Sequence, residues 1–157
     1  MLRNKTKIKS FTLVELLVAI SISLLLVSSA YLFFNNSYYQ NPVKSDIALF
    51  STFFSRAKNY ASNPENEKAK GYVLKKVADQ KLDIYRRIVT VSGAEQDLPL
   101  NQSVTLTNSK ISDFDAIFFA TPSGISSLAG PQQIIFTSVR NSDFKEEITI
   151  NKPGVIN

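Results

Sequence analysis

A single carboxylate lies near the start of the longest apolar stretch of the chain. Residues 9–34 read KSFTLVELLVAISISLLLVSSAYLFF, and Glu15 is followed by the uncharged residues 16–34. A carboxylate inside hydrocarbon costs about 2.5–3.5 kcal/mol on insertion scales, so it calls for a positively charged partner or a functional role. Because a plain membrane anchor would gain nothing from Glu15, this charge is the first candidate for chemistry in the sequence.

The other candidates for chemistry are paired carboxylates. The chain has no Cys and no His, which excludes disulfides, thiol nucleophiles, His-based triads and the usual zinc ligand sets. Asp113 with Asp115, and Glu146 with Glu147, are the pairs that could supply a general acid and base or hold a hard cation. No glycine-rich phosphate loop accompanies them, and solvated charges in a turn are the simpler interpretation. We therefore expect no enzyme activity, no cofactor and no metal.

Net charge is a poor argument for nucleic-acid binding here. The formal charge is +5, but four of the 18 Lys and Arg residues precede Ser10, so the rest of the chain is almost balanced. The adjacent basic pairs that could form a patch are Lys75-Lys76 and Arg86-Arg87. Because neighbouring residues on a strand point to opposite faces, each pair places only one cation on a face. DNA binding through these four residues is an alternative hypothesis.

The apolar stretch is long enough to cross a bilayer. About 20 helical residues, at a rise of 1.5 Å each, span a hydrocarbon core of about 30 Å. The residues before it carry no carboxylate and four cations: Arg3, Lys5, Lys7 and Lys9. The positive-inside rule therefore predicts a single-pass protein with a cytoplasmic N-terminus and the part after Phe34 outside the cytoplasm.

A second helical pattern follows the apolar stretch. Asn41-Pro42 predicts a kink, and Asn63-Pro64 followed by polar residues predicts the end of the helix. An apolar stripe with spacings of three and four predicts an amphipathic helix that packs on a sheet. The residues of this stripe are Ile47, Phe50, Phe54, Ala57 and Ala61.

From Gly71 onward, short β-like runs alternate with turn residues. The run 133–139 has apolar residues at both alternating sets of positions, which predicts a strand buried on both faces at its centre. The expected strands are 72–78, 82–91, 104–107, 116–120, 133–139, 147–150 and 155–156. The predicted fold class is α+β: a long N-terminal helix, transmembrane in its first half and amphipathic in its second, packed on an antiparallel sheet.

A short basic leader is followed by Ser10-Phe11-Thr12-Leu13-Val14-Glu15-Leu16-Leu17 and an apolar helix. This combination resembles the processing site, or class III signal peptide, of type IV prepilins and pseudopilins. The resemblance implies that a prepilin peptidase cuts between Ser10 and Phe11 and that Phe11 is then N-methylated. The family usually has Gly where this chain has Ser10. The implied parts are a leader (1–10), a transmembrane and filament-core helix (11–40) and an extracytoplasmic pilin-like domain (41–157).

Cleavage at this bond would change the electrostatics around Glu15. It creates an α-amine on Phe11 that is cationic at neutral pH and lies one helical turn from the carboxylate. Two unit charges about 4 Å apart interact by about 4 kcal/mol at an effective dielectric constant of about 20, which offsets the cost of burying Glu15. The resemblance implies that the amine comes from a neighbouring subunit, which fixes the stagger between helices bundled at the centre of a filament.

The C-terminal half carries a narrower resemblance. Ala116-Ile117-Phe118-Phe119 followed by Pro122-Ser123-Gly124 is similar to the GspH/FimT branch of minor pseudopilins. Some members of that branch bind DNA through a basic C-terminal motif with Gly and Arg, whereas residues 153–157 contain no Arg.

The expected function is that of a structural minor pilin or pseudopilin. Such a subunit is located in the inner (cytoplasmic) membrane before assembly. It helps to initiate or stabilise a type IV pilus or a type II secretion filament. Its implied partners are other pilin or pseudopilin subunits, the peptidase, and the assembly platform with its ATPase. The alternatives are a DNA-binding or surface-binding minor pilin of a competence or adhesion pilus, a secretory signal cut after Ala30, and an uncleaved anchor whose Glu15 reaches toward the interface.

Overall fold

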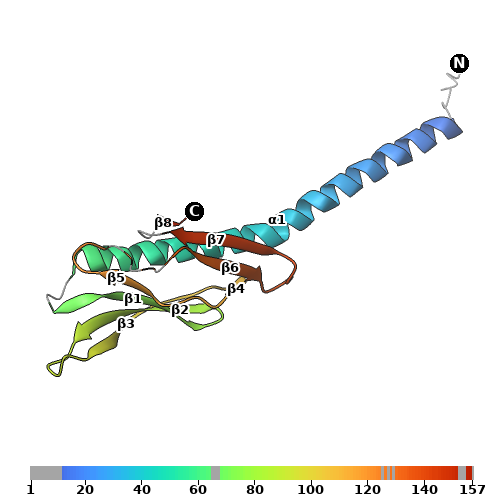
Figure 1. Ribbon diagram of the computed structural model, residues 1–157. Helices are drawn as coiled ribbons and strands as arrows, with labels where there is room; N and C mark the ends of the chain where they lie inside the picture. Colours follow the sequence, from blue (N-terminus) through green and yellow to red (C-terminus); the bar gives the residue numbers. More distant parts are fainter. Residues whose placement is uncertain are drawn as a thin grey trace, which may run out of the picture. The chain divides into compact units, whose positions relative to one another are not determined.

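The computed structural model describes residues 12–64, 68–124, 126, 128, 130–151 and 155–156 (Figure 1). One long helix precedes eight strands in the order α1 (Leu13–Ser62), β1 (Ala69–Ala78), β2 (Lys81–Val89), β3 (Glu95–Thr105), β4 (Ser109–Ile111), β5 (Ile117–Ala120), β6 (Gln132–Ser138), β7 (Lys145–Asn151) and β8 (Val155–Ile156). The chain divides into two compact units, Met1–Tyr38 and Tyr39–Asn157. The predicted α+β class, with a long N-terminal helix and antiparallel strands, is confirmed.

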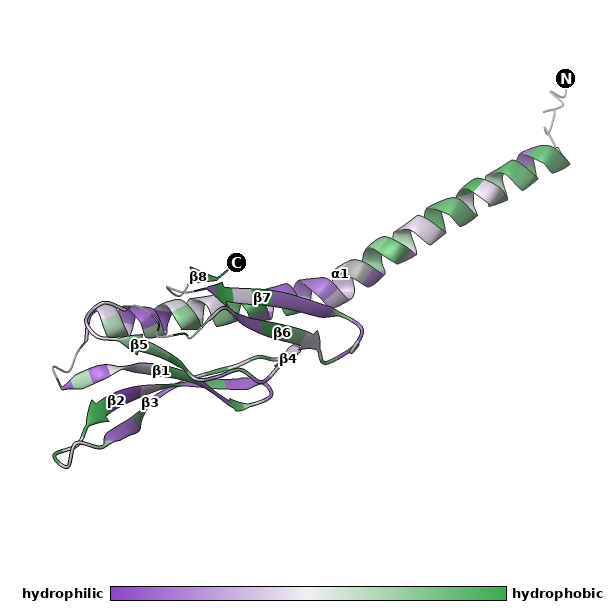
Figure 2. Cartoon of the chain, in the orientation of Figure 1, coloured by the Kyte–Doolittle hydropathy of each residue, from purple (hydrophilic) through white to green (hydrophobic). Residues whose placement is uncertain are grey.

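The described part of the first unit is a helix whose apolar side chains are exposed along its length. Figure 2 shows this segment as mainly hydrophobic, and it meets the length and composition of a membrane span. Its serine hydroxyls donate to backbone carbonyls of the preceding turn, as in Ser21 Oγ to Leu17 O at 2.9 Å and Ser28 Oγ to Leu24 O at 2.8 Å. Because the helix itself satisfies these hydroxyls, the serines add little polarity to the surface of the span.

In the second unit, α1 lays its apolar stripe against the strands, as predicted. Phe50, Phe54, Ala57 and Ala61 are buried and Ile47 packs against the core from a half-buried position. The helix continues through Pro42, so the kink stays a prediction. It ends at Ser62, directly before the predicted Asn63-Pro64 stop.

The strands form two antiparallel sheets of four rather than one. The first sheet has the order β3-β2-β1-β5 and the second the order β4-β6-β7-β8. Aromatic side chains of α1 contact both sheets: Phe54 meets Phe119 of β5 at 5.0 Å between ring centroids, and Phe50 meets Phe136 of β6 at 5.5 Å. The stripe on the helix therefore holds the two sheets in one core.

The strand predictions differ most from the structure at three places. The strand expected at 104–107 begins at Glu95, because an edge strand tolerates the polar residues, Pro99 and the positive φ of Asn101 that hid it in the sequence. The strand expected to reach Val91 stops at Val89, where the Thr90 and Gly93 amides begin a turn. The three-residue strand β4 was missed altogether.

The prediction that the strand at 133–139 is buried on both faces at its centre was also wrong. Ile134 and Phe136 are fully buried, whereas Ile135 is 37% exposed and Val139 is 48% exposed. Burial alternates along β6 because only one face of the second sheet is covered by the core.

A buried carboxylate joins α1 to the turn between β3 and β4. Asp46 is 1% exposed, and its Oδ2 accepts hydrogen bonds from the Asn108 amide at 2.9 Å and from Ser109 Oγ at 2.8 Å. Its Oδ1 accepts a third from Asn108 Nδ2 at 3.2 Å. Three donors from the adjacent residues Asn108 and Ser109 thus compensate the desolvation of this side chain.

Candidate functional site

Thr12 and Glu15 form a reciprocal capping box at the start of α1. The backbone amide and the hydroxyl of Thr12 each donate to Glu15 Oε2 at 2.9 Å. In return, the Glu15 amide donates to Thr12 Oγ1 at 3.2 Å. Thr12 is the N-cap and Glu15 the third helical residue, so both side chains satisfy amides that the first turn leaves without helical partners.

The capping box orients the carboxylate of Glu15 through Oε2 and leaves Oε1 able to accept a further hydrogen bond. Both bonds from Thr12 end on Oε2, and no residue in the described part of the chain donates a hydrogen bond to Oε1. Thr12 is a positioning residue that our sequence analysis missed, although Thr-x-x-Glu before an apolar run is a known capping signal. The predicted cleavage residues, Ser10 and Phe11, lie outside the described residues.

The four candidate DNA-binding residues separate onto two faces of the first sheet. In the pairing of β1 with β2, Arg87 lies opposite Gly71 and Arg86 opposite Tyr72. Because faces alternate along a strand, Lys75 shares a face with Arg87, and Lys76 shares the opposite face with Arg86. The structure therefore does not bring the four cations together.

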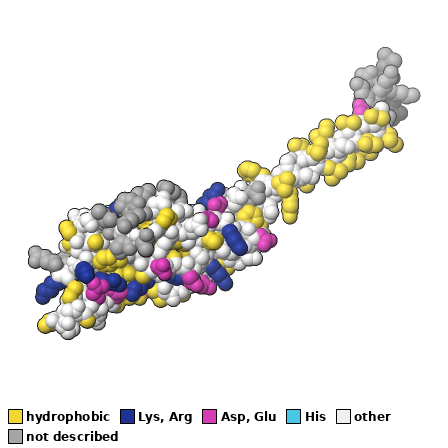
Figure 3. Space-filling view, in the orientation of Figure 1, with side chains coloured by type: hydrophobic (Ala, Val, Ile, Leu, Met, Phe, Trp, Pro, Cys, Tyr) yellow, Lys and Arg dark blue, Asp and Glu magenta, His cyan; other side chains and the backbone are white. Residues whose placement is uncertain are grey.

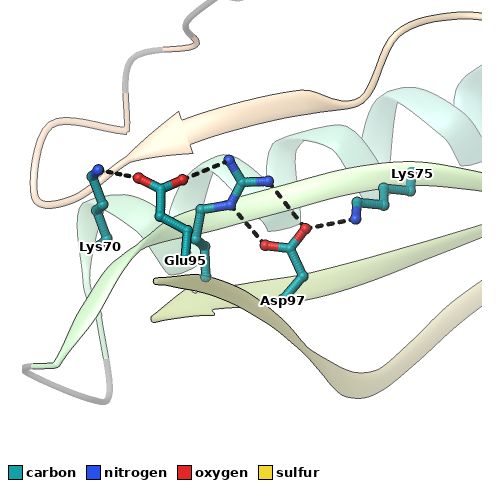
Figure 4. Close-up of polar contacts among 5 residues, drawn as sticks. Lys70, Lys75, Glu95 and Asp97 are labelled. Carbon is teal, nitrogen blue, oxygen red and sulfur yellow. Dashed lines mark hydrogen bonds and ion pairs between the residues drawn. The ribbon is translucent and has the colours of Figure 1, made fainter. Parts of the chain in front are cut away.

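Lys75 and Arg87 belong to a network of alternating charges (Figure 4). Asp97 accepts from Arg87 Nε at 2.7 Å, from Arg87 Nη2 at 3.0 Å and from Lys75 Nζ at 2.6 Å. Glu95 bridges Arg87, at 3.3 Å, to Lys70. This charge network lies on three adjacent strands, β1, β2 and β3, and pairs each of its cations with a carboxylate of the same sheet.

The other two candidate residues, Lys76 and Arg86, are engaged by carboxylates or buried. Lys76 Nζ contacts Asp113 at 2.7 Å, Asp79 at 3.2 Å and the carbonyl of Ile111 at 2.9 Å. Arg86 Nε is buried and receives no hydrogen bond partner among the described residues. Figure 3 shows basic and acidic side chains next to one another on the second unit. A phosphate would have to displace these carboxylates, so the arrangement does not favour DNA binding.

The two pairs of carboxylates are placed differently: Asp113 and Asp115 line one hollow beside β6, whereas Glu146 and Glu147 lie on β7. Asp113 is held by Lys76, while Asp115 is exposed in the segment before β5. Glu146 and Glu147 are consecutive on β7 and face opposite sides, since they pair with Phe136 and Ile135 of β6. Within the described ranges, no group of three or more residues could hold a metal ion.

The charge network predicts acid sensitivity. Hydrogen bonds from Arg87 hold the pKa of Asp97 down at about 2, with burial opposing and Lys75 assisting. A lowered pKa means that the stabilisation is complete above the ordinary value of the carboxyl, 3.8, and is lost as the pH falls from about 4 to about 2. We expect Asp97→Asn to lose about 1 kcal/mol of stability at pH 7, after allowing for solvent screening, and almost none at pH 2.

Urea unfolding of the full chain in a mild detergent, followed by tyrosine circular dichroism, measures this difference at each pH. Asp115→Asn is the matched control, because Asp115 is an exposed carboxylate outside the charge network. An equal loss for Asp97→Asn at pH 7 and pH 2 would contradict the assignment.

One of the comparisons with known proteins matches the start of the chain. Residues 5–31 match the family described as the prokaryotic N-terminal methylation motif. Neither the curated proteins nor the solved structures gave a match. The matched segment contains the capping box of Thr12 and Glu15 and most of the apolar run, and an α+β domain follows it. This match supports a type IV pilin-like class III signal peptide in residues 5–31 of the chain.

Proposed function

We propose that this protein is a minor pilin or pseudopilin, a structural subunit that helps to initiate or stabilise a type IV pilus or a type II secretion filament. The observation that carries the proposal is the position of Glu15: a carboxylate in the first turn of an exposed apolar helix, held on one oxygen by Thr12. Prepilin peptidase cuts between Ser10 and Phe11, and Phe11 is N-methylated.

Glu15 has no cationic partner among the described residues. Thr12 donates two hydrogen bonds but carries no charge, so it orients the carboxylate without neutralising it. The α-amine of Phe11 from a neighbouring subunit supplies the missing positive charge, and Oε1 is the oxygen that receives it. Processing thereby switches the subunit from membrane storage to assembly.

The apolar helix points to the same partners. Leu17, Leu24 and Leu25 are all more than half exposed, and the described residues of the chain provide nothing to cover them. Before assembly lipid covers this surface, with the N-terminus in the cytoplasm and the domain outside. In the filament, the helices of other subunits replace the lipid, and the assembly platform and its ATPase drive the exchange.

The proposed placement in the GspH/FimT branch rests on the resemblance of residues 116–124, which include the turn after β5. Gly124 has a φ of +64°, and a Cβ there would clash with Ser62 Oγ at the end of α1. The Pro-Ser-Gly turn therefore packs closely on the helix through a position that favours glycine.

Processing gives the direct test. Co-expression with a prepilin peptidase should yield a protein whose intact mass and N-terminal sequence begin at N-methylated Phe11. Ser10→Gly is the matched variant and should be cleaved at least as completely, since it restores the residue usual in the family. A chain that begins at Tyr31, or still at Met1 with an active peptidase and a cleaved control substrate, would overturn the proposal.

A further inference from the structure

The far end of the apolar segment carries exposed aromatic side chains on one face of the helix. Tyr31, Phe34 and Tyr38 are 69%, 70% and 56% exposed, and their spacing of three and four aligns them along α1. With Asn35 and Ser37 they line a shallow hollow. We call Tyr31, Phe34 and Tyr38 the aromatic stripe.

The distance along the helix places this stripe at a membrane boundary. Measured from Leu13 at 1.5 Å per residue, Tyr31 lies at about 27 Å, Phe34 at about 32 Å and Tyr38 at about 38 Å. A hydrocarbon core is about 30 Å thick, and core plus headgroup layers about 40–45 Å. A helix that enters the core near Leu13 therefore passes from hydrocarbon into the outer headgroup layer within the aromatic stripe.

The charge pattern gives the same boundary independently. After Glu15, the first charged residue is Lys44. Of this uncharged run, residues 16–38 lie in the first unit and extend about 35 Å as a helix, which is longer than the hydrocarbon core and reaches into the headgroup layer. The aromatic stripe occupies the outer third of residues 16–38, where its rings remain in contact with apolar chains and its hydroxyls reach water and headgroups.

The arrangement of the rings favours lipid over the helix of a second copy. Phe33 is also 70% exposed and lies about 200° around the helix from Tyr31, given 3.6 residues per turn. Aromatic side chains at one height on opposite sides of a helix form a belt, whereas a helix-helix seam would keep them on one side.

We propose that the aromatic stripe binds the headgroup layer of the outer leaflet and thereby fixes the depth of the helix in the membrane before assembly. This inference rests on the proposed membrane-inserted subunit and adds the surface that positions it. Leaving the bilayer for a filament then requires the stripe to give up its interfacial contacts, so the stripe opposes premature extraction of the subunit.

The chain has no Trp, which permits single-Trp depth measurements on the full-length protein. Phe34→Trp reports on the stripe, Leu24→Trp on the centre of the span and Leu49→Trp on the second unit. Each variant is placed in phosphatidylcholine vesicles whose acyl chains carry a quencher either near the headgroup or near the chain end. We expect the shallow quencher to act more strongly than the deep one on Phe34→Trp, the reverse on Leu24→Trp, and aqueous iodide to act on Leu49→Trp.

Two results would overturn the assignment of the stripe. Stronger quenching of Phe34→Trp by the deep probe would place the stripe inside the hydrocarbon core. Quenching that rises when the protein is diluted with lipid would show that a second copy covers the stripe. Depth control is tested by adding Tyr31→Ser and Tyr38→Ser to Leu24→Trp. A shift in the shallow-to-deep quenching ratio is expected, and an unchanged ratio would remove the proposed role.

Alkaline carbonate extraction of the same samples distinguishes the two levels of the proposal. A protein that stays in the membrane but shows no shallow quenching at Phe34→Trp retains the proposed function and loses only the interfacial stripe. A protein that carbonate releases completely is not inserted, which would overturn both.

Discussion

Glu15→Gln should abolish entry of the subunit into filaments while leaving its cleavage and membrane insertion intact. Gln has nearly the same size and retains an oxygen that accepts the Thr12 hydrogen bonds of the capping box. It lacks the charge that pairs with the α-amine of Phe11. Loss of an attraction of about 4 kcal/mol corresponds to a factor of about 1,000 in subunit association.

The measurement compares the processed subunit in sheared filaments with that in membranes. Thr12→Val is the matched control for the cap, because it removes the hydroxyl that donates to Oε2 at 2.9 Å but keeps the charge of Glu15. We expect Thr12→Val to lower assembly modestly, in line with about 1 kcal/mol for an N-cap, and Thr12→Ser to restore it. Filament yields of Glu15→Gln equal to the unmodified protein would show that its charge is not used in assembly.

Asp46→Ala should be the most destabilising exchange of a polar residue in the second unit, at about 3 kcal/mol. The side chain is 1% exposed and accepts three hydrogen bonds from Asn108 and Ser109. Its removal leaves the Asn108 amide and the Ser109 hydroxyl without their acceptor, and a buried donor of this kind costs about 1–3 kcal/mol. Urea unfolding of the full chain in detergent measures the difference in unfolding free energy.

Two controls separate the loss of the Asp46 hydrogen bonds from a general effect of removing a carboxylate. Asp115→Ala, at an exposed position, should stay within about 0.5 kcal/mol of the unmodified protein. Ser109→Ala combined with Asp46→Ala should cost less than the sum of the two single variants, since they share one hydrogen bond at 2.8 Å. Strict additivity would mean that Asp46 does not act through this turn.

Local pattern was sufficient for the elements that repeat along one segment. The apolar stripe through Phe50 and Phe54 predicted both the helix and its buried face, because side chains at spacings of three and four share one side of a helix whatever surrounds it. Asn63-Pro64 predicted the end of α1 for a similarly local reason. The match of residues 5–31 rests on the same contiguous segment that suggested a class III signal peptide.

Pairings between segments that are distant in the sequence could not be predicted from local patterns. The strand from Glu95 is polar and contains Pro99, and only its pairing with β2 makes it a strand. Ile135 looked buried because its type is apolar, but whether a strand is covered on one face or two depends on how many layers pack against the sheet.

The sequence by itself determined the long helix, the isolated charge of Glu15 and the antiparallel class, because each follows from composition and spacing within a short segment. The tertiary structure alone decided that Asp46 is buried and accepts a hydrogen bond from Ser109, and that Lys75 and Arg87 donate to Asp97. Asp46 and Ser109 are 63 positions apart, and the environment of a charged group depends on which surfaces come together rather than on its neighbours in the chain.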